Sequence, residues 1–357
     1  MVAHTSNAPF SPIFESTRNK TVEIIHYGAL AVVDSSGTII ASHGNPHSIC
    51  FLRSSAKPFQ ALSLIEAGGV QKWSLSPKEI AIICASHTGT DEHVRILNGL
   101  QAKIKVKEKD LLCGVHPPTD EATRDAMRKR GETPTPNRHN CSGKHTGMMA
   151  LAKLMHTTIE NYIDQEHPVQ KRILQSFGKM CDTPIENIII GMDGCSAPVF
   201  AIPLHKAAYG YARLCDPAGL GIERAAACNT ITRSMIDQPE MVAGPGMFDT
   251  RLMEVLQGKI ISKGGADGFQ QIGIMPGVLK KDSPGFGIAL KISDGDALYK
   301  VRPAVTLTVL DQLGVMTKDE LKELSDFGPW FAVKNWRNIV VGQAHPMIHS
   351  SNIHPPS

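Results

Sequence analysis

The chain begins with a segment in which residues that favour β-strands stand on both sides of a short polar turn. Residues 21–44 read TVEIIHYGALAVVDSSGTIIASHG, and the turn is Asp34-Ser35-Ser36-Gly37. Two runs of β-forming residues around such a turn are typical of a hairpin. The pattern therefore predicts that strands begin the fold.

Apolar residues at helical spacing follow. SAKPFQALSLIEAGG predicts a helix that has Pro58 in its first turn and stops at Gly68-Gly69. A capping box formed by Ser76 and Glu79 begins a short helix that runs into the apolar stretch IAIICASH. The same spacing predicts helices at about residues 90–105, 119–130, 142–156 and 168–180.

Strand patterns return in the second half of the chain. They occur in NIIIGMDG, KIISKGG, FQQIGI and GFGIALKISDGD. Helices are expected between and after them, at about residues 204–214, 221–236, 249–257, 300–314 and 318–325. A sheet built from both ends of the chain, with helices between, predicts a mixed α/β fold, although a two-layer α+β fold would give a similar pattern.

These elements predict one catalytic unit over residues 1–357. Its α/β body comprises about residues 1–70 and 185–345, and a helix-rich insertion comprises about residues 71–184. No linker rich in proline, glycine and serine divides the chain into independent domains.

Composition narrows the classes of protein. Lys and Arg number 37 against 34 Asp and Glu, and no long block of like charge occurs, so nucleic acid is not an expected partner. No apolar run has the length of a signal peptide or a membrane span, so we expect a soluble, cytoplasmic protein without a membrane partner. Eight cysteines in 357 residues are too few for a disulfide scaffold, which leaves free thiols or metal ligands.

Ser54 and Lys57 in the stretch RSSAKP are the first candidate for catalysis. At positions i and i+3 of a helix, both side chains lie on one face, within hydrogen-bond reach of each other. A neutral lysine could take the serine proton, and the N–H groups at the start of the helix could stabilise an oxyanion. The motif alone is a weak signal, because a serine that caps a helix and a lysine exposed to solvent match the same S-x-x-K pattern.

Ser86 and Lys263 are the second candidate pair. Ser86 follows an apolar predicted strand in CASHTGTDEH, and Lys263 ends a predicted strand in ISKGGADG. Penicillin-binding enzymes and serine β-lactamases have S-x-x-K, a second serine and a lysine before a small residue and glycine in this order. The middle motif, Ser86-His87-Thr88, and the spacings differ from theirs. A turn serine and an exposed lysine therefore remain the alternative to an amidohydrolase site.

The cysteines suggest a metal site. NRHNCSGKHTG brings together His139, Cys141, Lys144 and His145, and GMDGCSAP contains Cys195 after a predicted strand. Two thiolates, one nitrogen and an open position would suit zinc. The spacing is not that of a zinc finger, so packed cysteines remain the alternative.

Seven stretches together resemble the L-asparaginase II family, the Rhizobium-type asparaginases, whose fold is similar to that of serine β-lactamases and penicillin-binding enzymes. They run in order from about residue 21 to 345 and are VEIIHYGALAVVDSSG, RSSAKPFQALSLIEAGG, CASHTGTDEHV, NCSGKHTGMMAL, GMDGCSAPVFAIPL, MVAGPGMFDT and SKGGADG. The resemblance implies a serine β-lactamase-like sheet body with a helical insertion.

The resemblance also implies catalytic roles. Ser54 matches the family's nucleophile and Lys57 its activating partner, while Ser86 and Lys263 match a second Ser-Lys pair that relays protons. The reaction it implies is hydrolysis of L-asparagine to L-aspartate and ammonia through an acyl-enzyme.

Metal and substrate ligands follow from the same resemblance. Cys141, Lys144 and Cys195 match the ligands of one zinc ion per chain, with water as the fourth ligand, and the metal tunes substrate binding. Arg53, Asp193 and His145 stand where substrate-binding residues are expected. The resemblance further implies a homodimer.

Two other functions stay open at this point. An amidohydrolase for another small amide, such as glutamine or a β-lactam-like compound, would use the same catalytic residues. A non-catalytic, zinc-dependent amino-acid-binding protein would keep the metal ligands, and its Ser-Lys pairs would be incidental.

Overall fold

The computed structural model describes residues 9–348 and divides the chain into two compact units. Unit 1 comprises the chain up to Leu52, Ile202–Asp216 and the chain from Val255 onward. Unit 2 comprises Arg53–Ala201 and Pro217–Glu254 and includes the whole of the predicted helix-rich insertion.

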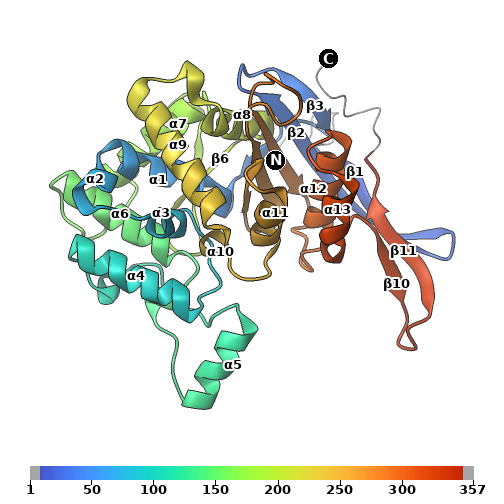
Figure 1. The fold of residues 1–357 in the computed structure, drawn as a ribbon, viewed down its shortest axis with the longest axis horizontal. Helices are drawn as coiled ribbons and strands as arrows, with labels where there is room; N and C mark the ends of the chain where they lie inside the picture. Colours follow the sequence, from blue (N-terminus) through green and yellow to red (C-terminus); the bar gives the residue numbers. More distant parts are fainter. Residues whose placement is uncertain (1–8, 349–357) are drawn as a thin grey trace, which may run out of the picture. The chain divides into compact units, whose positions relative to one another are not determined.

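Unit 1 is built on an antiparallel sheet (Figure 1). Its described part has eight strands in the order β10-β11-β1-β2-β9-β8-β7, with β3 paired to β2. The strands are β1 (Ser11–Arg18), β2 (Thr21–Asp34), β3 (Ile39–His43), β7 (Ile260–Gly264), β8 (Phe269–Ile274), β9 (Phe286–Ile292), β10 (Phe331–Lys334) and β11 (Val340–Pro346). A further short strand, β4 (Ile49–Phe51), ends just before unit 2.

The predicted hairpin is confirmed as β2 and β3, which pair from Leu30 with His43 to Val33 with Ile39. The strands predicted in KIISKGG, FQQIGI and GFGIALKISDGD are confirmed as β7, β8 and β9. Strands β1, β10 and β11 were not expected. Much of β10 and β11 is only partly buried, so their sequences lack the apolar runs that mark the central strands.

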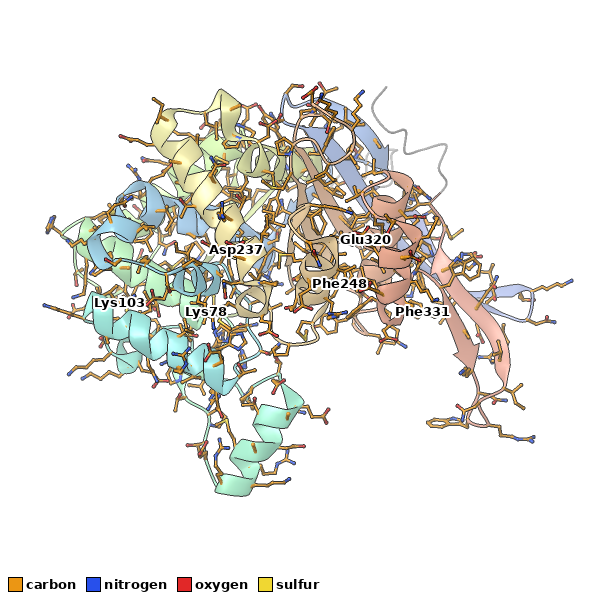
Figure 2. The ribbon with its side chains drawn as sticks, viewed as in Figure 1. Lys78, Lys103, Asp237, Phe248, Glu320 and Phe331 are labelled. Atoms are coloured by element: carbon orange, nitrogen blue, oxygen red, sulfur yellow. The ribbon has the colours of Figure 1, made fainter. Side chains whose placement is uncertain are left out.

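Helices α8 (Leu204–Cys215) and α12 (Val301–Gln312) pack on the sheet. Helix α8 lies so close to β9 that a Cβ atom at Gly287 would stand 1.8 Å from the carbonyl oxygen of Ala208. Every residue of β8 is buried, so both faces of this strand are covered, and α12 contacts it as well. Beside α12 lies α13 (Lys318–Glu323), where Glu320, labelled in Figure 2, accepts a hydrogen bond from Lys259 at 2.7 Å.

Unit 2 is largely helical (Figure 1). Its helices are α1 (Lys57–Glu66), α2 (Gly69–Trp73), α3 (Pro77–Ile83), α4 (Asp91–Ile104), α5 (Glu121–Arg130), α6 (Ser142–Leu154), α7 (Pro168–Met180), α9 (Ile222–Asp237), α10 (Pro239–Val242) and the greater part of α11 (Phe248–Leu256). Strand β5 (Ile189–Met192) pairs antiparallel with β6 (Pro198–Pro203). The helices predicted at residues 90–105, 119–130, 142–156 and 168–180 are confirmed as α4, α5, α6 and α7.

Charged pairs join α3 to α4 at the surface of unit 2. Lys103 donates to Glu79 at 2.7 Å, and Lys78 donates to Glu92 at 2.9 Å. Figure 2 labels both lysines. The predicted capping box of Ser76 and Glu79 is present at the start of α3. Ser86 follows shortly after the end of this helix.

The strand predicted directly before Ser86 is wrong, because Ile80–Ile83 belong to helix α3. The capping box begins the helix, and all four of these side chains are buried. Helix α3 packs against α4, α6 and α9. Because other helices cover this part of α3 on several sides, its sequence does not alternate between apolar and polar residues with helical spacing. A continuous apolar run of this length is also typical of a buried strand.

The predicted mixed α/β class, a sheet body that carries a helical part, is confirmed. In the part of the chain that the structure describes, no helix combines the length and the apolar composition needed to cross a bilayer.

We expect Gly287→Ala to destabilise unit 1, because the added methyl group has no room between β9 and α8. Overpacking of this kind costs about 1–3 kcal/mol in free energy of unfolding. Gly99→Ala in α4 is the matched control, since nothing lies within 4 Å of its Cβ position, and this change should stabilise the helix by about 0.5–1 kcal/mol. Denaturant unfolding measures both, and equal stability of the two variants would contradict the described packing.

Candidate active site

The side-chain amine of Lys57 joins three segments of unit 2. Lys57 is the first residue of α1 and is only 1% exposed. Its Nζ donates to the carbonyl oxygen of Ala85 at 2.5 Å and to that of Asn140 at 3.2 Å, and it lies 2.9 Å from Ser86 Oγ. The two carbonyls can only accept, so they use two N–H groups. The third position can donate to Ser86 when the amine is charged or accept from it when the amine is neutral.

Close packing of α6 on α3 brings these acceptors together. A Cβ atom at Gly143 would stand 2.0 Å from the carbonyl oxygen of Ile82, and one at Gly147 would stand 2.6 Å from the Ile83 side chain. Only glycine fits at such a distance. The carbonyl of Asn140, just before α6, therefore reaches the same amine as that of Ala85, just after α3.

Ser54 lies in the 3₁₀ turn Arg53–Ala56 that leads directly into α1. It is partly exposed, whereas the next residue, Ser55, is buried. Among the described residues no hydrogen bond is found for the Ser54 hydroxyl, and the amine of Lys57 bonds to Ser86 rather than to Ser54. Arg53 has a φ of 53°, in the left-handed region that non-glycine residues seldom adopt and that costs about 1–3 kcal/mol. Backbone strain thus adjoins the predicted nucleophile.

Arg53 and Asp193, both predicted to bind substrate, form an ion pair. Arg53 Nε donates to Asp193 Oδ1 at 2.9 Å, and the two side chains are 25% and 9% exposed. The same carboxylate accepts from the backbone N–H of Gly194, and its other oxygen lies 3.9 Å from Cys195 Sγ. Asp193 therefore connects the turn that holds Ser54 to the cysteine cluster.

Cys141, Lys144 and Cys195, the residues that match the family's zinc ligands, lie close together. All three are buried, and Lys144 Nζ donates to Cys195 Sγ at 3.0 Å. The mutual influence of the two neighbouring thiols holds the pKa of Cys141 well below its usual value and raises the pKa of Cys195. Burial lowers the pKa of Lys144, but the charges of Cys195, Cys141 and Asp193 outweigh it and raise the pKa.

This donor set fits zinc. Two sulfur ligands and one nitrogen ligand converge from two segments, and zinc accepts such ligands in tetrahedral geometry with one position open. Within residues 9–348, no group of three or more His, Cys, Asp or Glu side chains is arranged to hold a metal ion. The fit therefore depends on Lys144, which must lose its proton to bind.

His145 is the third residue predicted to bind substrate, and it is fully buried in α6. Its Nδ1 lies 2.7 Å from the hydroxyl oxygen of Tyr162, and its Nε2 has no hydrogen-bond partner within the described residues. Burial, and then the charge of Lys144, lower the pKa of His145 well below its usual value, so the ring is neutral.

Lys263 lies in unit 1, on β7, where the sequence predicts a strand. It is 1% exposed, and its Nζ donates to the carbonyl oxygen of Gly264 at 2.7 Å. The alternative of an exposed lysine is therefore wrong. Burial of this lysine at the end of β7 is compatible with a functional role for its amine.

A sequence model of L-asparaginase II matches residues 14–346, which is nearly the whole chain. This chain belongs to the L-asparaginase II family. The resemblance carried by the seven sequence stretches is confirmed, and this family member is an amidohydrolase. Its substrate and the roles of its site residues are considered below.

Solved structures show a more distant likeness. The Bacillus subtilis glutaminase in covalent complex with 5-oxo-L-norleucine is 12% identical over 78% of this chain and 87% of its own, with a TM-score of 0.34. A Bacillus glutaminase crystallised in the presence of 4.3 M NaCl is 11% identical over 81% of this chain and 91% of its own, with a TM-score of 0.37. No curated protein matches the chain. The family assignment rests on the match of residues 14–346 alone.

Two participants in the site of this L-asparaginase II family member were not expected from the sequence. The Asn140 carbonyl is a backbone group, which no motif marks. Tyr162 lies in a polar segment between α6 and α7 without a recognisable motif, and its contact with His145 depends on how that segment folds back.

Proposed function

We propose that this amidohydrolase is an L-asparaginase, which hydrolyses the side-chain amide of L-asparagine to L-aspartate and ammonia through an acyl-enzyme on Ser54. The observation that carries the proposal is the buried amine of Lys57, which begins the helix after Ser54 and hydrogen-bonds to Ser86 at 2.9 Å. A hydroxyl nucleophile, a lysine base and a second hydroxyl are the parts that acyl transfer needs.

Acylation begins when Ser54 Oγ attacks the side-chain carbonyl carbon of asparagine. The Ser54 proton passes to Lys57, which acts as a neutral amine, and from there through Ser86 to the leaving nitrogen. The C–N bond breaks and ammonia departs, which leaves an ester between Ser54 and an aspartyl group. The family resemblance further suggests Lys263 as a group that carries protons in this reaction.

Deacylation uses the same groups in reverse. A water molecule attacks the ester carbonyl, gives its proton to Lys57 and displaces Ser54 Oγ, which regains its proton as L-aspartate leaves. Lys57 therefore takes up one proton and gives it back within each half of the reaction.

Arg53, Asp193 and His145 bind the amino-acid part of the substrate in this proposal. A guanidinium group suits the α-carboxylate, and a carboxylate suits the α-ammonium group. The Arg53–Asp193 ion pair supports this assignment. The α-carboxylate of one amino acid could pair with Arg53 while its α-ammonium group pairs with Asp193.

We propose that Cys141, Lys144 and Cys195 hold one zinc ion per chain. Bound there, zinc would supply a fixed positive charge that tunes substrate binding. Support comes from the convergence of the three donors and from Asp193, whose carboxylate lies 3.9 Å from Cys195 Sγ.

Homodimer formation stays a prediction from the family resemblance, and a cytoplasmic location stays a prediction from the sequence.

The nucleophile is tested with Ser54→Ala. We expect ammonia release from L-asparagine to fall by about 1,000-fold or more, because no other group can form the ester. The variant should keep its thermal unfolding temperature, since no hydrogen bond of this hydroxyl is found among the described residues. Ser63→Ala is the matched control, because Ser63 lies on the following helix and its buried hydroxyl has no partner in the described structure.

Near-normal ammonia release by Ser54→Ala would contradict the nucleophile assignment. Assays of the unaltered protein with L-asparagine and L-glutamine in parallel decide the substrate. Release from glutamine alone would replace the proposed substrate but keep the same catalytic groups, and release from neither would favour the amino-acid-binding alternative.

Zinc binding is tested with Cys141→Ser. The unaltered protein should contain one zinc ion per chain by elemental mass spectrometry, and the variant should contain almost none, because a serine hydroxyl is a poor zinc ligand. Cys113→Ser is the control, since Cys113 lies within electrostatic range of Cys141 but donates its S–H to backbone carbonyls. Zinc retained by Cys141→Ser, or lost equally in both variants, would argue against the proposed ligands.

A further inference from the structure

Tyr162 is a fully buried tyrosine whose role the proposed reaction leaves unexplained. Its side chain is 0% exposed, and Gln170 on α7 holds its backbone through a hydrogen bond to the carbonyl oxygen at 2.7 Å. The ring lies edge-on to His145, with the centroids 5.5 Å apart. A buried phenol needs partners for its hydroxyl, and here it has two.

The two partners fix the direction of the hydrogen bonds. The backbone N–H of Leu112 can only donate, so it donates to the Tyr162 oxygen at 2.8 Å. The phenol proton then has one acceptor among the bonds of the described residues, Nδ1 of His145 at 2.7 Å. If Nδ1–H of His145 donated to Tyr162 instead, both the phenol proton and the lone pair on Nε2 would lack partners. If the phenol donates to Nδ1, only the N–H at Nε2 lacks a partner among the described residues.

That unpartnered N–H is a costly feature. A buried donor without an acceptor costs about 1–3 kcal/mol. His145 directly follows Lys144 on α6, and Lys144 Nζ donates to Cys195 Sγ at 3.0 Å, so the group lies beside the cysteine cluster. A ligand that supplies an oxygen acceptor would satisfy it.

We propose that Tyr162 is a positioning residue, whose hydroxyl holds His145 in the tautomer with its hydrogen on Nε2, so that this N–H donates to an oxygen of the substrate. The inference rests on the proposed function. It adds that His145 recognises a carboxylate or carbonyl oxygen, because in this tautomer it cannot accept a hydrogen bond from the substrate ammonium group at Nε2.

The tautomer is read by NMR of protein labelled with ¹⁵N in its histidines. His145→Gln identifies the two ring resonances, and Ser54→Ala allows asparagine to be added without turnover. We expect Nδ1 to have the shift of a non-protonated nitrogen, Nε2 to have that of a protonated one, and Nε2 to move when L-asparagine is added. In Tyr162→Phe, the two shifts should move toward each other as the second tautomer becomes populated.

Steady-state kinetics of Tyr162→Phe provide a second test. KM for L-asparagine should rise about tenfold in Tyr162→Phe, as for the loss of one oriented hydrogen bond, and kcat should change little. Tyr211→Phe, which removes the hydroxyl of another fully buried tyrosine, in α8 of unit 1, should leave the His145 resonances and KM unchanged.

A protonated Nδ1 in the unaltered protein would overturn the inference, as would His145 resonances and a KM that are the same in Tyr162→Phe as in the unaltered protein. Failure of the proposed function is a separate result. It would appear as an absence of ammonia release from L-asparagine, whereas the NMR spectra report the tautomer whether or not the protein turns over.

Discussion

The burial of the Lys57 amine is the constraint on which the rest of unit 2 depends. An amine removed from water is costly unless its hydrogen-bonding groups find partners, and here the surrounding backbone supplies the acceptors. Here they come from the end of α3 and the start of α6, which meet because Gly143 and Gly147 allow the two helices to touch. The amine thus fixes Ser86, which follows Ala85, and Cys141, which follows Asn140.

A continuous series of contacts extends from this centre to the predicted nucleophile by a second route. Lys144, one turn after Cys141 on α6, donates to Cys195 Sγ at 3.0 Å, and Cys195 Sγ lies 3.9 Å from the carboxylate of Asp193. Asp193 pairs with Arg53, which precedes Ser54 and has a left-handed backbone. The cysteine cluster is thus joined through Asp193 to the residue that precedes Ser54.

The sequence predicts local structure well here because the signals are local. Proline, glycine and capping residues mark the helix ends, and α7 agrees with its predicted limits of 168 and 180. The end of helix α3 was misread because Ile80–Ile83 are all buried. The Ser54–Lys57 spacing predicts that the two share a turn, but the observed bond from Lys57 to Ser86 spans 29 positions and depends on helix packing that no local pattern encodes. The same holds for Tyr162 and His145, which are 17 positions apart.

The most direct test of this account is identification of the acyl-enzyme. The protein would be mixed with L-asparagine, quenched in acid within its first turnovers, digested and analysed by mass spectrometry. The account predicts an aspartyl ester on the peptide that contains Ser54, with fragment ions that assign it to that residue. An ester on Ser86 would contradict it, because Lys57 would then activate its hydrogen-bonded partner as the nucleophile rather than relay a proton through it.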